Sequence, residues 1–403
     1  MKSWILNNAE MVLTILISIM ICMTRSSMAF GNLMYGLIIL MTLITCWYRR
    51  HEISVPQSIR QYGWAYLVML LCVLPSAFIS DDILVTTKYF FNIWVWKVLI
   101  IVPILLCIKS SRKLYTILSV FFVYMGIDAL SAFGQYLAHY NLDFGDRAGG
   151  VINGSVMGLA MLLSFSFPLA LIAMFDKSFP KYVRLSAIFS SLGILLGMWG
   201  NQSRGSWLFN GINGVLITLR YCFVNIRYIL VLFVTVVGIG YAFTSNQSYM
   251  ERLESTFNIT TDGSNLGRIY VWEADKHMIM DHPVTGVGPG LWQKTYREHY
   301  KLKQETQDLG HSHNNLLQIA SESGILGLIG FLGFSFFIFC KSLIHYVKSR
   351  NPYDLSIMVG FISYLFLFGS IDYTWGNSSG IRMFWIVMGI MIQLKINENH
   401  KII

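Results

Sequence analysis

The chain has 403 residues, of which 55% are hydrophobic and only 13% are charged. A soluble domain carries about 25% charged residues, so the composition excludes an ordinary soluble protein. Apolar runs of roughly 20 residues recur along the whole chain without the alternating pattern of barrel strands, which indicates an all-α polytopic membrane protein. The formal net charge of +9 is explained by membrane topology and does not imply a nucleic-acid partner.

Twelve apolar runs predict twelve transmembrane helices, at about residues 10–24, 28–47, 64–80, 89–108, 115–138, 154–175, 185–201, 206–219, 228–244, 316–340, 355–371 and 380–394. The first run lacks a clear small-x-small cleavage site, which favours a retained helix over a signal peptide. Among the short loops, those on the N-terminal side hold most of the Lys and Arg, so both termini are expected in the cytoplasm. The chain then divides into residues 1–243 with nine spans, a large outer loop over residues 244–315, and residues 316–403 with three spans and a short cytoplasmic tail.

The outer loop after the fifth span reads HYNLDFGDRAGGVINGSVMG and places Arg147 beside Gly145, Gly149 and Gly150. A glycine-rich entry to a helix can present backbone N–H groups and an arginine to an anion. The alternative is an ordinary interfacial turn.

The turn GNQSRGSW between the seventh and eighth spans holds Arg204 at the outer face. An arginine in so short a turn either reaches lipid headgroups or binds an anion above the bilayer.

The outer loop over residues 244–315 is the longest polar stretch and contains five of the nine histidines. Its segment SNLGRIYVWEADKHMIMDHP is expected to be helical, with Ser264 or Asn265 as the N-cap. Arg268, Trp272 and Asp275 then fall at i, i+4 and i+7, on one face. A glycine-proline turn follows, and QKTYREHYKLKQETQD is interpreted as an amphipathic surface helix.

The junction HSHNNLLQIASESGILGLIG leads from this loop into the tenth span. Asn314 or Asn315 is expected to cap the helix, which leaves His311 and His313 at its positive end, where an anion is favoured. Glu322 continues a polar stripe into the span and is expected to orient other groups. Gly324, Gly327, Gly330 and Gly333 repeat every three residues and predict a smooth face for close helix packing.

The last outer loop, IDYTWGNSSGIR, brings Asp372, Tyr373, Trp375 and Arg382 to the same side. Interfacial anchoring by the aromatic residues is the preferred interpretation of this loop.

The outer side therefore offers arginines and two near-adjacent histidines, and the sequence has no CxxC, HxxxH or DxD motif, so no metal or other cofactor is expected. Arginine suits phosphate through bidentate bonds, and a neutral histidine can take a proton from a hydroxyl group. Together they suit a reaction in which a sugar hydroxyl attacks and a diphosphate leaves. Outside the cytoplasm, the activated donor would be a lipid diphosphate in the membrane.

These residues resemble the O-antigen ligase/polymerase family of bacterial membrane glycosyltransferases. The family's signature H[NSQ]-x9-G-x2-G is matched by His313, Asn314, Gly324 and Gly327. The resemblance extends to SRGSW at residues 203–207, to GRIYVW…HPVTGVGPG at residues 267–290, and to the single large loop late in a twelve-span plan.

The resemblance implies a bundle related to the GT-C membrane glycosyltransferases, in the bacterial inner membrane, with its active site facing the periplasm. It implies inverting, metal-independent transfer of O-antigen polysaccharide from undecaprenyl diphosphate to lipid A–core oligosaccharide, in lipopolysaccharide biosynthesis. His313 would be the catalytic base. Arg204, Arg268 and, more weakly, Arg147 would bind the diphosphate, and His311, Asn314 and Glu322 would orient the site.

Three alternatives remain open at this point. An O-antigen polymerase and a protein O-oligosaccharyltransferase belong to the same superfamily and differ in the acceptor. A lipid or sugar transporter would instead show inverted repeats and polar residues along several spans, and neither is evident in the sequence.

Overall fold

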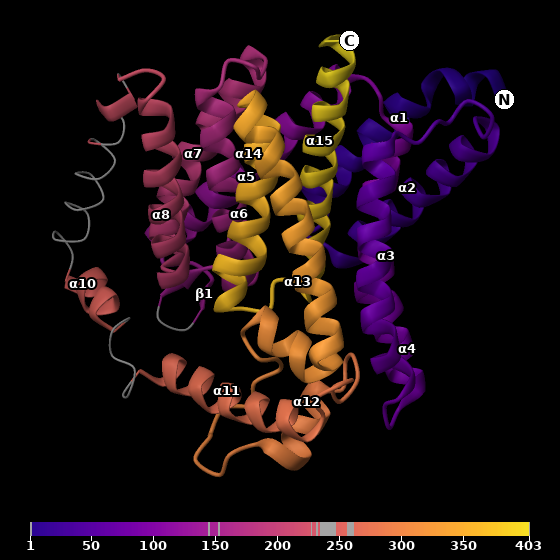
Figure 1. The fold of residues 1–403 in the computed structure, drawn as a ribbon. Coiled ribbons are helices and arrows are strands. Elements are labelled where there is room, and N and C mark those ends of the chain that lie inside the picture. The colour runs from indigo at the N-terminus through magenta and orange to yellow at the C-terminus, as the bar shows by residue number, and fades with distance from the viewer. Residues whose placement is uncertain are drawn as a thin grey trace.

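The structure is a computed structural model and describes residues 2–143, 146–151, 154–226, 228–230, 233, 247–255 and 262–402. Within these ranges, long helices form one bundle, and shorter helices lie across one end of it (Figure 1). The bundle contains α1 (Lys2–Met23), α2 (Met28–Tyr48), α3 (Gln57–Phe78), α4 (Ile83–Phe90), α5 (Ser111–Leu137), α6 (Val156–Phe175), α7 (Lys181–Asn201), α8 (Arg204–Cys222), α13 (Asn315–Ser349), α14 (Pro352–Phe361) and α15 (Ser378–Ile402).

Two of the described spans contain π-helical and 3₁₀ turns. After α4 the chain continues through a π-helical turn (Phe91–Val95), a 3₁₀ turn (Trp96–Val98) and a second π-helical turn (Pro103–Cys107), and α14 continues through a π-helical turn (Ile362–Leu367) into a 3₁₀ turn (Phe368–Ser370). A two-stranded antiparallel ribbon pairs β1 (Leu142–Asp143) with β2 (Arg147–Ala148). Such departures from α-helical geometry are tolerated in a membrane where the surrounding protein satisfies the backbone.

Nine helical spans in the described ranges are long and apolar enough to cross a membrane. They confirm an all-α polytopic protein, and a shorter apolar helix, Asn8–Met23, coincides with the first predicted span. The predicted count of twelve is not confirmed. The eighth predicted span lies within α8, which is not among those nine, and most of residues 228–244 lie outside the described residues. Both termini lie at one end of the bundle, as the predicted topology requires (Figure 1).

The centre of the bundle is formed by α6 and α15, whose apolar windows are 94% buried, whereas the windows of α2 and α3 are only 33% and 28% buried. Small residues let α5 and α7 approach closely: a Cβ atom added to Gly197 would lie 2.6 Å from the Cβ of Ala129. This contact fixes the outer end of α7, where Gln202 takes the left-handed conformation that turns the chain into α8.

The outer layer contains α10 (Gln247–Glu254), α11 (Gly263–Asp281), α12 (Trp292–Thr295) and a π-helical turn (Tyr296–Tyr300), and α11 lies across the end of the bundle opposite the termini (Figure 1). This outer layer has a small hydrophobic core of its own, made by Val271, Ala274, Met278, Trp292 and Tyr296. The predicted α11 is confirmed, but its cap is wrong: Asp262, not Ser264 or Asn265, accepts from the Asn265 N–H. The predicted amphipathic helix is also wrong beyond Tyr300, where the chain is irregular up to α13.

The helix α13 is interrupted at Gly324, which has φ +60° and ψ −167°. The N–H group of Ile325 donates to the carbonyl of Pro283 instead of continuing the helical ladder. Gly330 packs closely against α3, where an added Cβ would lie 2.6 Å from the Cβ of Cys72, whereas the nearest α3 atom to a Cβ on Gly327 is Cγ2 of Val73 at 3.7 Å. Among the described residues, nothing lies within 4 Å of a Cβ added to Gly333. The predicted glycine row is therefore a packing face only in part, because its first member breaks the helix and its last has open space.

Candidate active site

The two histidines of the junction lie just before α13. Asn314 is the N-cap, and its side-chain oxygen accepts from the N–H groups of Leu316 and Leu317. Asn315, the alternative cap, is instead completely buried and bonds to Leu365 and Thr374. His313 has φ +51°, in the left-handed region that non-glycine residues rarely adopt. Such backbone strain costs about 1–3 kcal/mol and is typical of functional sites.

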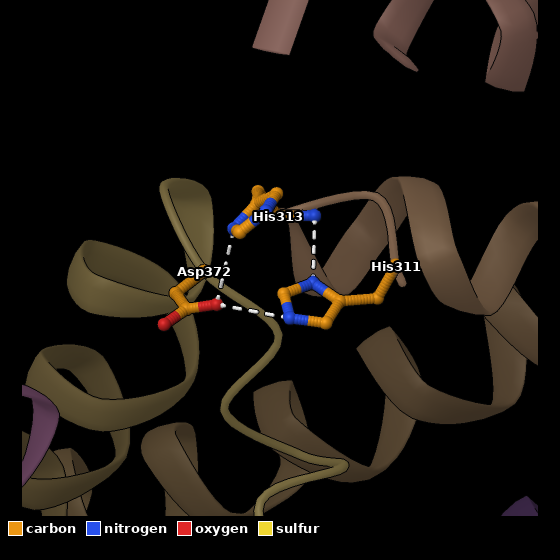
Figure 2. A group of neighbouring side chains, drawn as sticks. All are labelled: His311, His313 and Asp372. Carbon is orange, nitrogen blue, oxygen red and sulfur yellow. Dashed lines mark hydrogen bonds and ion pairs between the residues drawn. The ribbon is translucent and has the colours of Figure 1, made fainter. Parts of the chain in front are cut away.

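Asp372, from the last outer loop, joins these histidines (Figure 2). Its Oδ1 atom lies 3.4 Å from Nδ1 of His313 and 3.7 Å from Nε2 of His311. The backbone N–H of His313 donates to Nδ1 of His311 over 3.1 Å. Because Nδ1 of His311 is thus an acceptor, the neutral ring carries its proton on Nε2, which faces the carboxylate. Likewise, a proton on Nδ1 of His313 would face Asp372 and leave the Nε2 lone pair of His313 for a substrate.

Electrostatics favour a neutral His311 and a charged Asp372. Burial lowers the pKa of His311 to about 4, and His313 and Arg268 act in the same direction. Burial alone would raise the pKa of Asp372, yet the nearby imidazoles of His313 and His311 hold it below its ordinary value. A carboxylate that orients an imidazole and stabilises its protonated form is the arrangement that lets histidine act as a general base.

The same three side chains could also bind a metal ion, since one ligand atom from each lies within 4.8 Å of the others. No motif of the sequence predicts this cluster, because Asp372 is remote from the histidines along the chain. The hydrogen bonds of these three residues make them a poor set of metal ligands. A metal on Nε2 of neutral His311 would move the ring proton to Nδ1, where the N–H of His313 already points.

A polar cavity of about 390 Å³ lies beside this cluster. Its lining residues come from the spans, the outer layer and the last outer loop: Tyr89, Ser155, Met157, Gly158, Met161, Gly290, Trp292, Gln293, Gly310, His311, Gln318, Glu322, Asp372, Tyr373, Gly376 and Asn377. The buried Lys97 donates to the carbonyl of Gly376 at 3.0 Å, which puts its amino group behind one wall. The cavity gives His311 and Asp372 access to a polar ligand, while Arg204, Arg268 and His313 do not line it.

Glu322 connects α13 to the glycine-proline turn, and its predicted orienting role stays a prediction. Its Oε1 atom accepts from the Gly290 N–H and from Nε2 of Gln318, each at 3.0 Å. The Gly288 N–H donates to the Glu322 carbonyl at 2.9 Å. Glu322 therefore joins the glycine-proline turn of residues 283–290 to the first part of α13.

Arg204 is engaged by the outer layer. It donates to the carbonyl and the hydroxyl group of Ser255, both at 2.9 Å, and forms an ion pair of 3.0 Å with Asp262, the cap of α11. The side chain thus connects the turn between α7 and α8 to the start of α11.

Arg268 lies closer to the histidine cluster. Its Nε donates to the carbonyl of Ile371, next to Asp372, at 3.3 Å, and Nη1 donates to Ser264. Burial lowers the pKa of Arg268, and Asp372 opposes that effect. Within the described chain, no hydrogen bond involves Nη2, so this nitrogen has donors for a ligand.

Arg147 is held on the opposite side of the α7–α8 turn, where it donates to the carbonyl of Asn201 at 3.3 Å. The neighbouring N–H groups are already used: Gly150 donates to Gln135 and Val151 to Asp128. The N–H groups of Gly150 and Val151 are thus engaged within the protein, Gly145 lies outside the described residues, and the anion site of this loop stays a prediction.

The contacts of Asp372, Ser312 and Asp275 around the histidines are not predicted by the sequence. The loop of Asp372 is expected there to be an interfacial anchor. Its acidic side chain among aromatic residues at the outer end of a span was the available signal. Asp275 and Ser312 gave no such signal, because their contact depends on how α11 lies across the bundle.

The bundle and this outer polar site define a polytopic helical membrane protein with a candidate acid–base centre at one membrane boundary. Residues 185–332 match the family model described as O-antigen ligase, so this part of the chain is similar to that family. The matched region includes Arg204, Arg268 and His313 but not Arg147 or Asp372. It indicates the superfamily of glycosyltransferase-like ligases and polymerases. No curated protein matches the chain closely enough to add to this finding.

Proposed function

We propose that this protein transfers O-antigen polysaccharide from undecaprenyl diphosphate to lipid A–core oligosaccharide at the periplasmic face of the bacterial inner membrane. The observation that carries the proposal is the contact between His313 and Asp372, in which a strained histidine turns one ring nitrogen to a carboxylate. The family match supports the reaction class, and the polar cavity beside Asp372 supports access for a sugar.

In the proposed reaction, Nε2 of His313 takes the proton from a hydroxyl group of the acceptor sugar. The hydroxyl oxygen attacks the anomeric carbon from the face opposite the diphosphate, so the new glycosidic bond forms as the bond to the diphosphate breaks. The configuration at the anomeric carbon is inverted. Asp372 stabilises the imidazolium ion that forms, and the diphosphate carries away the bonding electron pair.

The arginines take unequal parts in this proposal. Arg268 has donors available at Nη2 and is electrostatically coupled to Asp372, so it is assigned to the leaving diphosphate. Arg204 would have to release Asp262 or Ser255 before binding it. Arg147 is the weakest of the three, and His311, Asn314 and Glu322 orient the site.

The test is transfer in vitro with purified protein, lipid-linked O-antigen and lipid A–core, with and without a chelator. Wild-type protein is expected to make the conjugate under both conditions, and His313→Ala to make none. In cells, loss of the protein should leave bare core while lipid-linked polysaccharide accumulates. Single repeat units on the core would instead identify a polymerase, and glycan on a protein would identify an oligosaccharyltransferase.

A further inference from the structure

One face of α11 contacts the chain on both sides of the histidine cluster. Arg268, Trp272 and Asp275 occupy successive turns of this face. Nε of Arg268 donates to the Ile371 carbonyl at 3.3 Å, and Nε1 of Trp272 donates to the Ser312 carbonyl at 2.9 Å. The helix thereby connects the loop that holds Asp372 to the loop that holds both histidines.

Ser312, between the two histidines, is completely buried and fixed through all its polar groups. Its N–H donates to Oε1 of Gln318 at 2.7 Å, its hydroxyl to Oδ1 of Asp275 at 2.9 Å, and its carbonyl accepts from Trp272. Gln318 is itself anchored by Glu322 at 3.0 Å. The backbone immediately before His313 therefore has little freedom to rotate.

Asp275 is the point where these supports meet. Its side chain has no exposed surface, and its Oδ1 atom accepts from Nε1 of Trp292 at 2.6 Å and from the hydroxyl groups of Ser312 and Ser321, each at 2.9 Å. These donors come from α12, the histidine loop and α13. No hydrogen bond to Oδ2 occurs within the described chain.

We propose that Asp275 and Ser312 are positioning residues for His313, acting through hydrogen bonds that hold its backbone in the left-handed conformation. This inference rests on the proposed function. A left-handed histidine relaxes to ordinary backbone angles unless its surroundings prevent it. Because a catalytic group must be held to within about 0.5 Å of its productive position, removing the Ser312 contact should misplace the imidazole without removing any group that touches substrate.

The test compares kcat and KM for purified Ser312→Ala, Asp275→Ala and the double variant, normalised to folded protein. Each single change is expected to lower kcat by about 10- to 100-fold, since a displacement near 1 Å has effects of this size. KM should stay within about twofold. The double variant should be no slower than Asp275→Ala, because both changes remove the same contact.

Asp275→Asn provides the conservative rescue, since its amide oxygen can replace Oδ1. It should recover most of the kcat that Asp275→Ala loses. Glu273→Gln, on the exposed part of α11, is the matched control and should behave as wild type. If Asp275→Ala does not fold, Ser312→Ala and Trp272→Phe make the same comparison, because each removes one support of Ser312.

Unchanged kcat in Ser312→Ala, a rise in KM in place of a fall in kcat, or additive losses in the double variant would overturn the positioning role. No recovery in Asp275→Asn would overturn it as well. Failure of the proposed function would look different: wild-type protein itself would make no conjugate, or His313→Ala would remain active.

Discussion

Two clusters near the outer ends of the helices each pair a basic side chain with an aspartate, but their surroundings differ. Arg25 and Asp128 form an ion pair of 2.9 Å with side chains only 3% and 0% exposed. The pair holds the loop after α5, since Arg25 donates to the carbonyl of Gly149 and Asp128 accepts from Val151. His313 and Asp372 lie 3.4 Å apart, with side chains 20% and 5% exposed, beside a polar cavity.

The two clusters differ in whether a polar atom stays accessible to a ligand. The Arg25–Asp128 pair is enclosed by the loop backbone, so it stabilises one conformation of the chain. The histidine cluster holds Nδ1 of His313 against a carboxylate and has a strained backbone there. Among the described residues, no hydrogen bond involves Nε2 of His313. Complete burial within the loop backbone indicates a structural role for an ion pair, and partial exposure with a maintained strain indicates chemistry.

The largest expected effect comes from replacing His313 with glycine. His313→Gly removes the base, so transfer should fall by about 10²- to 10⁴-fold. Glycine adopts φ +51° without strain, so the variant should be at least as stable as the wild type in thermal unfolding. A large loss of stability would show that His313 is a structural residue like Arg25.

Matched changes at the two aspartates make the comparison directly. Asp372→Asn should lower kcat by about 10²-fold or more, because the imidazole loses the charge that orients and stabilises it. Asp128→Asn should leave kcat per folded molecule unchanged but reduce stability, since removing one partner of a buried pair costs about 3–5 kcal/mol.

The test measures thermal unfolding and kcat on the same preparations of Asp372→Asn and Asp128→Asn. Equal losses of kcat in Asp372→Asn and Asp128→Asn would remove the distinction between the clusters.

The support beneath the histidine cluster offers a second matched pair. A Cβ on Gly324 would lie 2.2 Å from the Val284 carbonyl oxygen, and the residue has angles that only glycine adopts readily. Gly324→Ala should therefore reduce stability by several kcal/mol, and the transfer rate should fall with it. Gly333→Ala should be neutral in both, because nothing lies within 4 Å of its added Cβ. Equal stability of the two variants, measured by thermal unfolding in detergent, would contradict this account of the helix break.

The sequence was sufficient to predict most of the membrane helices, because long apolar runs have few alternative structures. It also predicted the Asn314 cap and one shared face for Arg268, Trp272 and Asp275, since both depend on neighbours along the chain. The roles of His313, Arg204 and Arg268 in transfer remain predictions.

What the sequence could not predict depends on contacts between remote segments. The pairing of Asp372 with His313 requires α14 to return the chain to the start of α13, and no local pattern encodes that distance. In the sequence, Gly324 looks like any other glycine of a packing face. Only the structure shows that the Ile325 N–H donates to the Pro283 carbonyl instead of a helical acceptor. The central places of α6 and α15 were hidden for the same reason, because all apolar spans look alike in composition.

The smallest expected effect is a pH dependence of stability due to His311. An unfolded histidine gains its proton near pH 6.5, whereas the pKa of folded His311 is about 4 because burial disfavours the charged ring. Between these values the unfolded chain binds more protons, so folding loses stability as the pH falls from about 6.5 to 4. His311→Gln should lose less stability over that interval, and the variant and wild type should change in parallel above pH 7. Since the side chain is 34% exposed, solvent screening keeps the difference small. Thermal unfolding of both proteins between about pH 4 and 6.5 measures this difference. Identical dependence of stability on pH would mean that the pKa of His311 is the same in the folded and the unfolded chain.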